Sequence, residues 1–157
     1  MGKKVLVVDD EKEITADTVI ISTGATAKYL GLEDEKKYAG MGVSACATCD
    51  GFFYKGKEVV VLGGGDTALE EAHYLAKICK KVYLVHRRDT FRATPSSVER
   101  VKHMDNIELI LNASVKEVVG DAMGVNGVIV ETADGERKLD VPGIFVFVGR
   151  TVNNGSL

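Results

Sequence analysis

Apolar runs and one amphipathic stretch alternate in the middle of the chain. Residues 57–62 and 82–85 are almost continuously apolar, which is typical of strands buried on both faces of a parallel sheet. Between them, residues 66–79 carry apolar side chains at spacings of four, three and four, which places these side chains on one face of a helix. The members of this face are Ala68, Ala72, Leu75 and Cys79. The pattern predicts a strand–helix–strand unit whose two parallel strands are adjacent.

The second half of the chain changes to shorter segments. Residues 96–103 favour a short helix, and residues 107–111 favour a third parallel strand. Three strand-like segments follow at 114–119, 127–132 and 136–139, with turns expected at Gly120–Asp121 and Asp134–Gly135. The last apolar run, 144–148, is a further parallel strand. We therefore expect an α/β fold, with a Rossmann-like parallel sheet, flanking helices and an inserted antiparallel β-meander.

Two short apolar segments precede this region. Residues 4–8 and 18–21 are predicted strands joined by a polar turn, and residues 26–42 are predicted to be a polar, irregular connector. The acidic pair Asp9–Asp10 after the first strand also resembles the magnesium-binding start of a phosphoacceptor receiver domain. Such a domain needs another aspartate at the end of a middle strand, whereas Asp50 lies inside a cysteine-containing segment. A solvated turn is the simpler interpretation, because aspartate favours turns.

Composition narrows the classes of function. The 157 residues are 45% hydrophobic, and 20 basic against 23 acidic side chains give a formal net charge of −3. Nucleic-acid-binding domains are usually markedly basic, so we expect no nucleic-acid partner. No apolar run approaches the roughly 18 residues of a membrane helix, and the start of the chain lacks the apolar core of a signal peptide. We therefore expect a cytoplasmic protein with no membrane partner.

A glycine turn is the first candidate binding feature. The residues Gly63, Gly64, Gly65, Asp66, Thr67 and Ala68 satisfy the pattern G-x-G-x-x-A between a predicted strand and a predicted helix. In a dinucleotide site, the first glycine permits the tight turn, the second leaves room for the pyrophosphate, and the small third residue lets the helix pack on the strand. Backbone N–H groups at the start of the helix bind the anion. A turn that serves packing alone is the alternative, but the strand–helix–strand context favours a dinucleotide site.

The residues after the next predicted strand indicate which dinucleotide is bound. About 20 residues beyond the glycines, an NAD site carries an acid that binds the ribose hydroxyls. This chain has His86, Arg87, Arg88 and Arg92 in that region. Arginine suits a phosphate because its donors form a planar fork, so we expect NADPH held by its 2′-phosphate, with a neutral His86 at the adenosine end. A solvated basic loop is the alternative.

Two of the three cysteines form a C-x-x-C motif, Cys46 and Cys49, directly followed by Asp50. This spacing allows a small disulfide ring and often lowers the pKa of one thiol, and a neighbouring carboxylate is suited to moving the proton that thiol–disulfide exchange requires. A structural zinc site is the alternative, but it needs four ligands, and the three histidines supply no second ligand pair at zinc-binding spacing. We therefore expect no metal, and we expect Cys79 to be a small buried apolar residue.

Three segments together resemble the low-molecular-weight thioredoxin reductases, a group of pyridine nucleotide-disulfide oxidoreductases. They are residues 42–54 (GVSACATCDGFFY), 63–68 (GGGDTA) and 86–92 (HRRDTFR), in the order and spacing of that family's central region. The resemblance implies reduction of thioredoxin by NADPH through FAD and a dithiol, by a homodimer in the full-length family. It also implies that Cys49 faces the flavin, that Cys46 exchanges with thioredoxin and that Asp50 is the acid/base group. Arg87, Arg88 and Arg92 would hold the 2′-phosphate.

The resemblance also suggests how the chain is organised. Residues 1–25 resemble a strand pair at the edge of the FAD domain and its hinge, residues 26–150 resemble the NADPH-binding domain with its C-x-x-C motif, and residues 151–157 are a tail whose Gly155–Leu157 resembles a cloning scar. The family's earlier glycine-rich unit and later Gly-Asp segment, which bind FAD, are not recognisable in the sequence. We therefore expect no NADPH-driven turnover from these residues alone. The alternative is an isolated nucleotide-binding or engineered α/β module without turnover.

Overall fold

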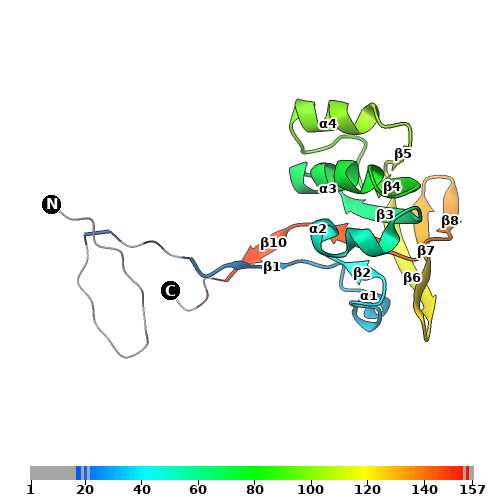
Figure 1. Ribbon diagram of the computed structural model, residues 1–157, viewed down its shortest axis with the longest axis horizontal. Helices are drawn as coiled ribbons and strands as arrows, with labels where there is room; N and C mark the ends of the chain where they lie inside the picture. Colours follow the sequence, from blue (N-terminus) through cyan, green and yellow to red (C-terminus); the bar gives the residue numbers. More distant parts are fainter. Residues whose placement is uncertain (1–16, 19, 21, 154, 156–157) are drawn as a thin grey trace. The chain divides into compact units, whose positions relative to one another are not determined.

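The computed structural model describes residues 17–18, 20, 22–153 and 155, and Figure 1 shows its ribbon. The chain divides into two compact units, residues 1–26 with 151–157 and residues 27–150. Strands β1 (Ala25–Ala27) and β10 (Arg150–Val152) pair as a two-stranded sheet. The strand predicted at residues 4–8 lies outside the described residues, as do positions 19 and 21 of the strand predicted at 18–21. The described residues of that second segment, Thr18 and Ile20, are not in a strand.

The larger unit is built on a five-stranded parallel sheet with the order β2-β9-β3-β4-β5. The strands are β2 (Val43–Ser44), β3 (Glu58–Gly63), β4 (Lys81–Val85), β5 (Ile107–Ile110) and β9 (Ile144–Phe147). Strands β3 and β4 are adjacent and parallel, with Val60 opposite Tyr83. This confirms the predicted strand–helix–strand unit and the α/β fold. The order places β3, which leads into the glycine turn, at the middle of the sheet.

Side chains of β3 point alternately into two separate cores. Val59 and Val61 are fully buried with the apolar face of helix α3 (Asp66–Ala76), and helix α4 (Pro95–Lys102) contributes Val101 to the same core. Val60 and Leu62 pack instead with apolar residues of the β-meander. The alternation follows from the pleat of a strand, in which successive side chains point to opposite faces. The sheet therefore has helices on one face and the meander on the other (Figure 1).

The antiparallel β-meander is confirmed. It consists of β6 (Ser114–Asp121), β7 (Gly124–Thr132) and β8 (Gly135–Leu139). Its first turn lies at residues 122–123, two residues later than predicted, because the Asp121 carboxylate accepts the backbone N–H of Met123 at 2.7 Å and closes the turn there. Its second turn, at residues 133–134, is one residue earlier than predicted.

Helix α3 is shorter than its apolar pattern predicted, because it ends at Ala76 and not at Cys79. The N–H groups of Lys77 and Ile78 bond to the carbonyls of Tyr74 and Leu75, three residues back. Such bonds tighten the last turn and end the helix. Helix α4 begins at Pro95, where a missing N–H has no cost at a first helical position.

Several short elements were not predicted. The segment 26–42, expected to be irregular, contains helix α1 (Glu33–Lys37), and the cysteine region contains α2 (Ala47–Asp50) and the 3₁₀ helix η1 (Gly51–Tyr54). Strands β1, β2 and β10 were also missed. Elements of two to five residues show no apolar period. Helix α1 depends instead on the buried Glu35, whose carboxylate accepts the N–H groups of residues 30 and 31 at 3.0 and 2.9 Å.

No helix within the described part of the chain has both the length and the apolar composition that crossing a membrane requires.

Candidate functional site

The glycine turn connects β3 to α3 and has the geometry of a dinucleotide loop. Gly63 has a φ of +152°, and a Cβ at this position would lie 2.6 Å from both the Cβ of Ala68 and the carbonyl oxygen of Phe147. Gly65 is the N-cap of α3, and a Cβ there would meet no atom within 4 Å. Gly63 is therefore enclosed by packing, whereas Gly65 faces free space at a helix N-terminus, where an anion is favoured.

Gly64 has a different role, because it makes room for a side chain. A Cβ at Gly64 would lie 2.1 Å from Cε1 of the His86 ring. That ring is buried, with Nε2 3.0 Å from the carbonyl oxygen of Thr90 and its face stacked on Phe91 at a centroid distance of 5.3 Å. His86 is thus fixed beneath the glycine turn at the end of β4.

Burial lowers the pKa of His86 below its ordinary value, and the positive charges of Arg88 and Arg87 act in the same direction, whereas the bond to Thr90 opposes them. We expect an NMR titration of the ring to give a midpoint below 6.5. On acidification the unfolded chain takes up this proton first, so the free energy of unfolding should start to fall near pH 6.5 and level off below the folded pKa. His86→Gln should flatten this part of the pH dependence in urea unfolding. A midpoint above 6.5 would contradict the burial argument.

Three arginines surround the same turn. Arg87 and Arg88 follow β4 after His86, and the backbone N–H of Arg92 donates to the carbonyl of Gly64 at 2.7 Å. All three side chains are exposed, and among the described residues none of them forms an ion pair with a carboxylate. Three unneutralised guanidinium groups beside a helix N-terminus form a site suited to phosphate.

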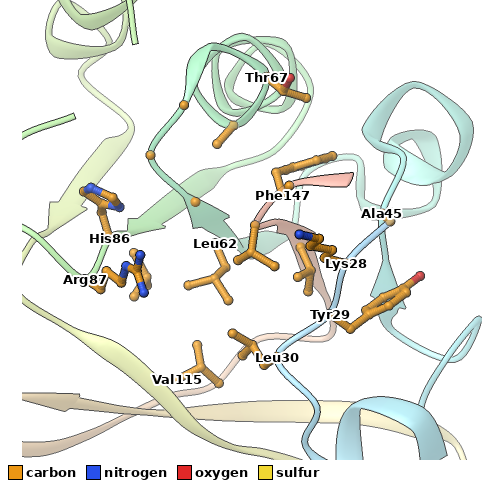
Figure 2. A pocket seen from close by; sticks show the side chains of 18 of the residues that line it. Lys28, Tyr29, Leu30, Ala45, Leu62, Thr67, His86, Arg87, Val115 and Phe147 are labelled. Atoms are coloured by element: carbon orange, nitrogen blue, oxygen red, sulfur yellow. The ribbon is translucent and has the colours of Figure 1, made fainter. Parts of the chain in front are cut away.

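The glycine turn and the arginines line one cleft of about 710 Å³ in the larger unit. Figure 2 shows His86 and Arg87 on one side of this cleft, and Lys28, Tyr29 and Leu30 on the other. Its apolar lining includes Leu62, Val85, Val115 and Val146. The cleft also reaches Ala45, the residue before Cys46. A single cleft therefore extends from the basic cluster to the edge of the C-x-x-C segment.

The side chain of Asp66 is engaged within the protein. One of its oxygens accepts both the backbone N–H and the hydroxyl of Thr94 at 2.9 Å, and these two hydrogen bonds are the largest cause of its lowered pKa. Asp66 and Thr67 line the cleft as predicted positions of the glycine motif. The carboxylate of Asp66 nevertheless ties the segment after Arg92 to the start of α3.

Cys46 and Cys49 form a disulfide with a Cα–Cα distance of 5.3 Å. Cys46 is the N-cap of α2, and its sulfur accepts the backbone N–H of Cys49 at 3.2 Å. Cys49 is exposed, whereas Cys46 is half-buried. Asp50 ends α2 and accepts a hydrogen bond from the Ser44 hydroxyl at 2.6 Å. The short α2 thus places both sulfurs and the carboxylate within one turn.

The remaining cysteine has a different environment. Cys79 lies in the core between α3 and the sheet, where burial raises the pKa of its thiol to about 11. Among the described residues, no three His, Cys, Asp or Glu side chains come together as metal ligands.

Some residues of the cleft carried no signal in the sequence. Lys28 and Tyr29 belong to a segment predicted to be an irregular connector, and Phe147 and Arg150 lie about 80 residues beyond the glycines. Parallel strand order brings β9 next to β3, so these residues become neighbours only in three dimensions. The partner of Asp50, Ser44, was missed because β2 itself was not predicted.

The fold, the glycine turn and the dithiol define a class of protein. Residues 1–157 match the family described as pyridine nucleotide-disulphide oxidoreductase, and the chain belongs to this family. A thioredoxin reductase of Helicobacter pylori is 55% identical over 155 residues, which are 98% of this chain and 50% of the relative. The crystal structure of Lactococcus lactis thioredoxin reductase, titled as its FR conformation, matches with a TM-score of 0.82 and 34% identity, over 91% of this chain and 48% of that one.

The resemblance to thioredoxin reductases is thereby confirmed. The chain spans about half the length of the relatives it matches. A Pseudomonas fluorescens relative named glucosaminate ammonia-lyase is also 50% identical, over 92% of this chain and 46% of its own length. Overall identity therefore does not distinguish the reactions of these relatives, and the function has to be argued from the site.

Proposed function

We propose that this chain carries the NADPH site and the redox-active dithiol of a thioredoxin–disulfide reductase. The observation that carries the proposal is the Cys46–Cys49 disulfide, which lies in the same compact unit as the glycine turn and its arginines. A surface disulfide across two residues, followed by a carboxylate, is suited to exchange with another disulfide. This feature favours reductase chemistry over a nucleotide-binding module without turnover.

The cleft fits a phosphorylated dinucleotide. Gly65 leaves open space at the N-terminus of α3, where backbone N–H groups would receive the pyrophosphate. Arg87, Arg88 and Arg92 would hold the 2′-phosphate, which NADH lacks. When bound, NADPH supplies a hydride, and FAD is the group that the family resemblance places between this hydride and the disulfide. The segment that resembles the edge of the FAD domain, residues 1–25, lies mostly outside the described residues, and we assign no residue to FAD.

The dithiol would act in two successive thiol–disulfide exchange steps. The Cys46 thiolate attacks the disulfide of thioredoxin and forms a mixed disulfide, and one thioredoxin sulfur leaves as a thiolate. Cys49 then gives its proton to the Asp50 carboxylate and attacks Cys46 Sγ. The Cys46–Cys49 bond forms, the bond to thioredoxin breaks, and Asp50 passes the proton to the second thioredoxin thiolate.

A trapping experiment tests these roles. Reduced Cys49→Ser and Cys46→Ser variants are each mixed with a thioredoxin whose nucleophilic cysteine carries a thionitrobenzoate group and whose second active-site cysteine is replaced by serine. Attack by Cys46 releases coloured thionitrobenzoate and leaves a stable mixed disulfide, because no second thiol resolves it. We expect Cys49→Ser to accumulate this adduct at least about tenfold faster than Cys46→Ser, a difference in activation free energy of about 1.4 kcal/mol.

The matched control is Cys79→Ala, which removes the third thiol and should leave both rates unchanged, because Cys79 is buried. Equal trapping by the two variants would overturn the assignment of Cys46. Binding of NADPH without any exchange would favour the nucleotide-binding module instead. The cytoplasmic location and the absence of a nucleic-acid partner remain predictions from the sequence, and the homodimer is what the resemblance implies for the full-length family alone.

A further inference from the structure

The hydroxyl of Ser44 joins the two ends of the dithiol segment. Its oxygen accepts the backbone N–H of Cys46 at 3.1 Å and lies 2.6 Å from Oδ2 of Asp50. The carbonyl oxygen of Cys46, at 3.3 Å, competes for the single hydroxyl hydrogen. The carboxylate takes it, because this contact is shorter and charge-assisted, and such O–H···O⁻ bonds are about twice as strong as neutral ones.

Ser44 is held more firmly than the carboxylate that it contacts. It is the last residue of β2, opposite Phe145 of β9 in the parallel sheet, and only 7% of its surface is exposed. Asp50 is half-buried and ends α2, a helix of four residues. Sheet pairing of its backbone fixes the direction of the Cα–Cβ bond, and the hydrogen bond from the N–H of Cys46 selects the position of the hydroxyl oxygen. The hydroxyl in turn fixes one oxygen of the carboxylate.

The contacts form a continuous chain from the Cys46 N–H through the Ser44 hydroxyl to the Asp50 carboxylate. Hydrogen bonds in such a chain polarise and strengthen one another. The pKa of Tyr54 is raised first by burial and then by the negative charge of Asp50, which therefore lies near this phenol. Without the hydrogen bond from Ser44, the Asp50 side chain would be free to change its rotamer.

We propose that Ser44 is a positioning residue, which holds the Asp50 carboxylate where it exchanges a proton with the dithiol. The inference rests on the proposed function, in which Asp50 takes the proton from Cys49 and returns it to the thioredoxin thiolate. Ser44 gives up no proton in this step. It acts on the reaction only through the orientation of Asp50.

A double-mutant cycle tests this dependence on Asp50. Each variant is reduced, freed of reductant and mixed with oxidised thioredoxin, and the rate of a single exchange is followed by thioredoxin fluorescence. General acid–base groups contribute about 100-fold or more to such rates, and we expect Ser44→Ala to slow exchange about tenfold by misplacing Asp50. The same change in an Asp50→Asn background should have no further effect, because the group being positioned is already removed.

Two further comparisons distinguish an effect on the position of Asp50 from an effect on folding. Ser44→Thr and Ser44→Val have nearly the same shape, and we expect the threonine variant to exchange within about twofold of the unchanged chain, whereas the valine variant matches Ser44→Ala. Ser97 is a serine that is more deeply buried than Ser44 and is bonded to Thr94 and Arg100, and Ser97→Ala should leave the exchange rate unchanged.

The outcomes distinguish the two proposals. If Asp50→Asn slows exchange but Ser44→Ala does not, only the inference about Ser44 is overturned. If Asp50→Asn leaves the rate unchanged, the role of Asp50 in the proposed function fails, and the inference fails with it. Equal slowing by Ser44→Ala in both backgrounds would show an effect independent of Asp50 and would also overturn the inference.

Discussion

Replacing Arg87 and Arg88 together by alanine should weaken NADPH binding about 100-fold and leave NADH binding nearly unchanged. Both guanidinium groups line the cleft beside the glycine turn, and no described carboxylate neutralises them. A hydrogen bond to a charged group contributes about 1.5–3 kcal/mol, and the loss of two at the lower end of this range, which suits exposed side chains, corresponds to roughly this factor. The ratio of NADPH to NADH affinity, measured by calorimetry, should therefore narrow about 100-fold, and a narrowing of less than about tenfold would contradict the assignment.

The matched control for this experiment is Arg100→Ala. Arg100 is also exposed, but it lies on α4, contacts Glu70 and Ser97, and does not line the cleft. We expect its replacement to leave both affinities unchanged. If the unmutated chain binds NADPH and NADH equally well, the assignment of the 2′-phosphate to this cluster is wrong.

Gly63→Ala should destabilise the chain by about 3 kcal/mol, the upper range for overpacking a close contact. The φ of +152° disfavours any side chain, and the new Cβ would lie 2.6 Å from Ala68 Cβ and from the Phe147 carbonyl oxygen. Neither atom is free to retreat, because Ala68 is packed on the sheet and the Phe147 carbonyl is backbone. The midpoint of thermal unfolding should fall by roughly 10 °C.

Gly65→Ala is the matched comparison, two residues further along the same turn. A Cβ there would meet no protein atom within 4 Å, so we expect the unfolding midpoint to stay within about 2 °C of the unchanged chain. The same Cβ would enter the space proposed for the pyrophosphate and should weaken NADPH binding. Comparable destabilisation by the two variants would contradict the packing argument, and unchanged NADPH affinity in Gly65→Ala would contradict the binding site.

Long elements of the fold were predictable because their patterns repeat. The apolar run of β3 and the apolar face of α3 each contain several apolar residues at the expected spacing, so one atypical residue does not hide the pattern. The end of α3 was wrong because Cys79 continues the apolar period while the backbone has already turned at Lys77. Helix α1 was missed because it depends on one buried carboxylate, Glu35, and not on a pattern.

The candidate site was predictable where its residues are close in sequence. The glycine turn and the C-x-x-C motif are local, and the structure describes both where they were expected, although the roles of their residues remain to be tested. Lys28 and Ala45 could not be found in this way. Lys28 reaches the cleft because its N–H bonds to the carbonyl of Gly149, and Ala45 because it follows β2, which pairs with β9. The contact of Gly64 with His86 is likewise invisible in a motif that assigns no role to the middle glycine.

Two backbone segments of the site are joined side by side. The N–H of Arg92 bonds to Gly64, Thr94 bonds to Asp66, and the His86 ring lies against Gly64, in the space that a Cβ would occupy. A change of the proposed preference for NADPH would therefore require residues 63–66 and 86–94 to be replaced together. If the arginine-bearing segment alone were transferred to another protein, the His86 ring would need a glycine at the position of Gly64. Any larger residue at that position would clash with the ring.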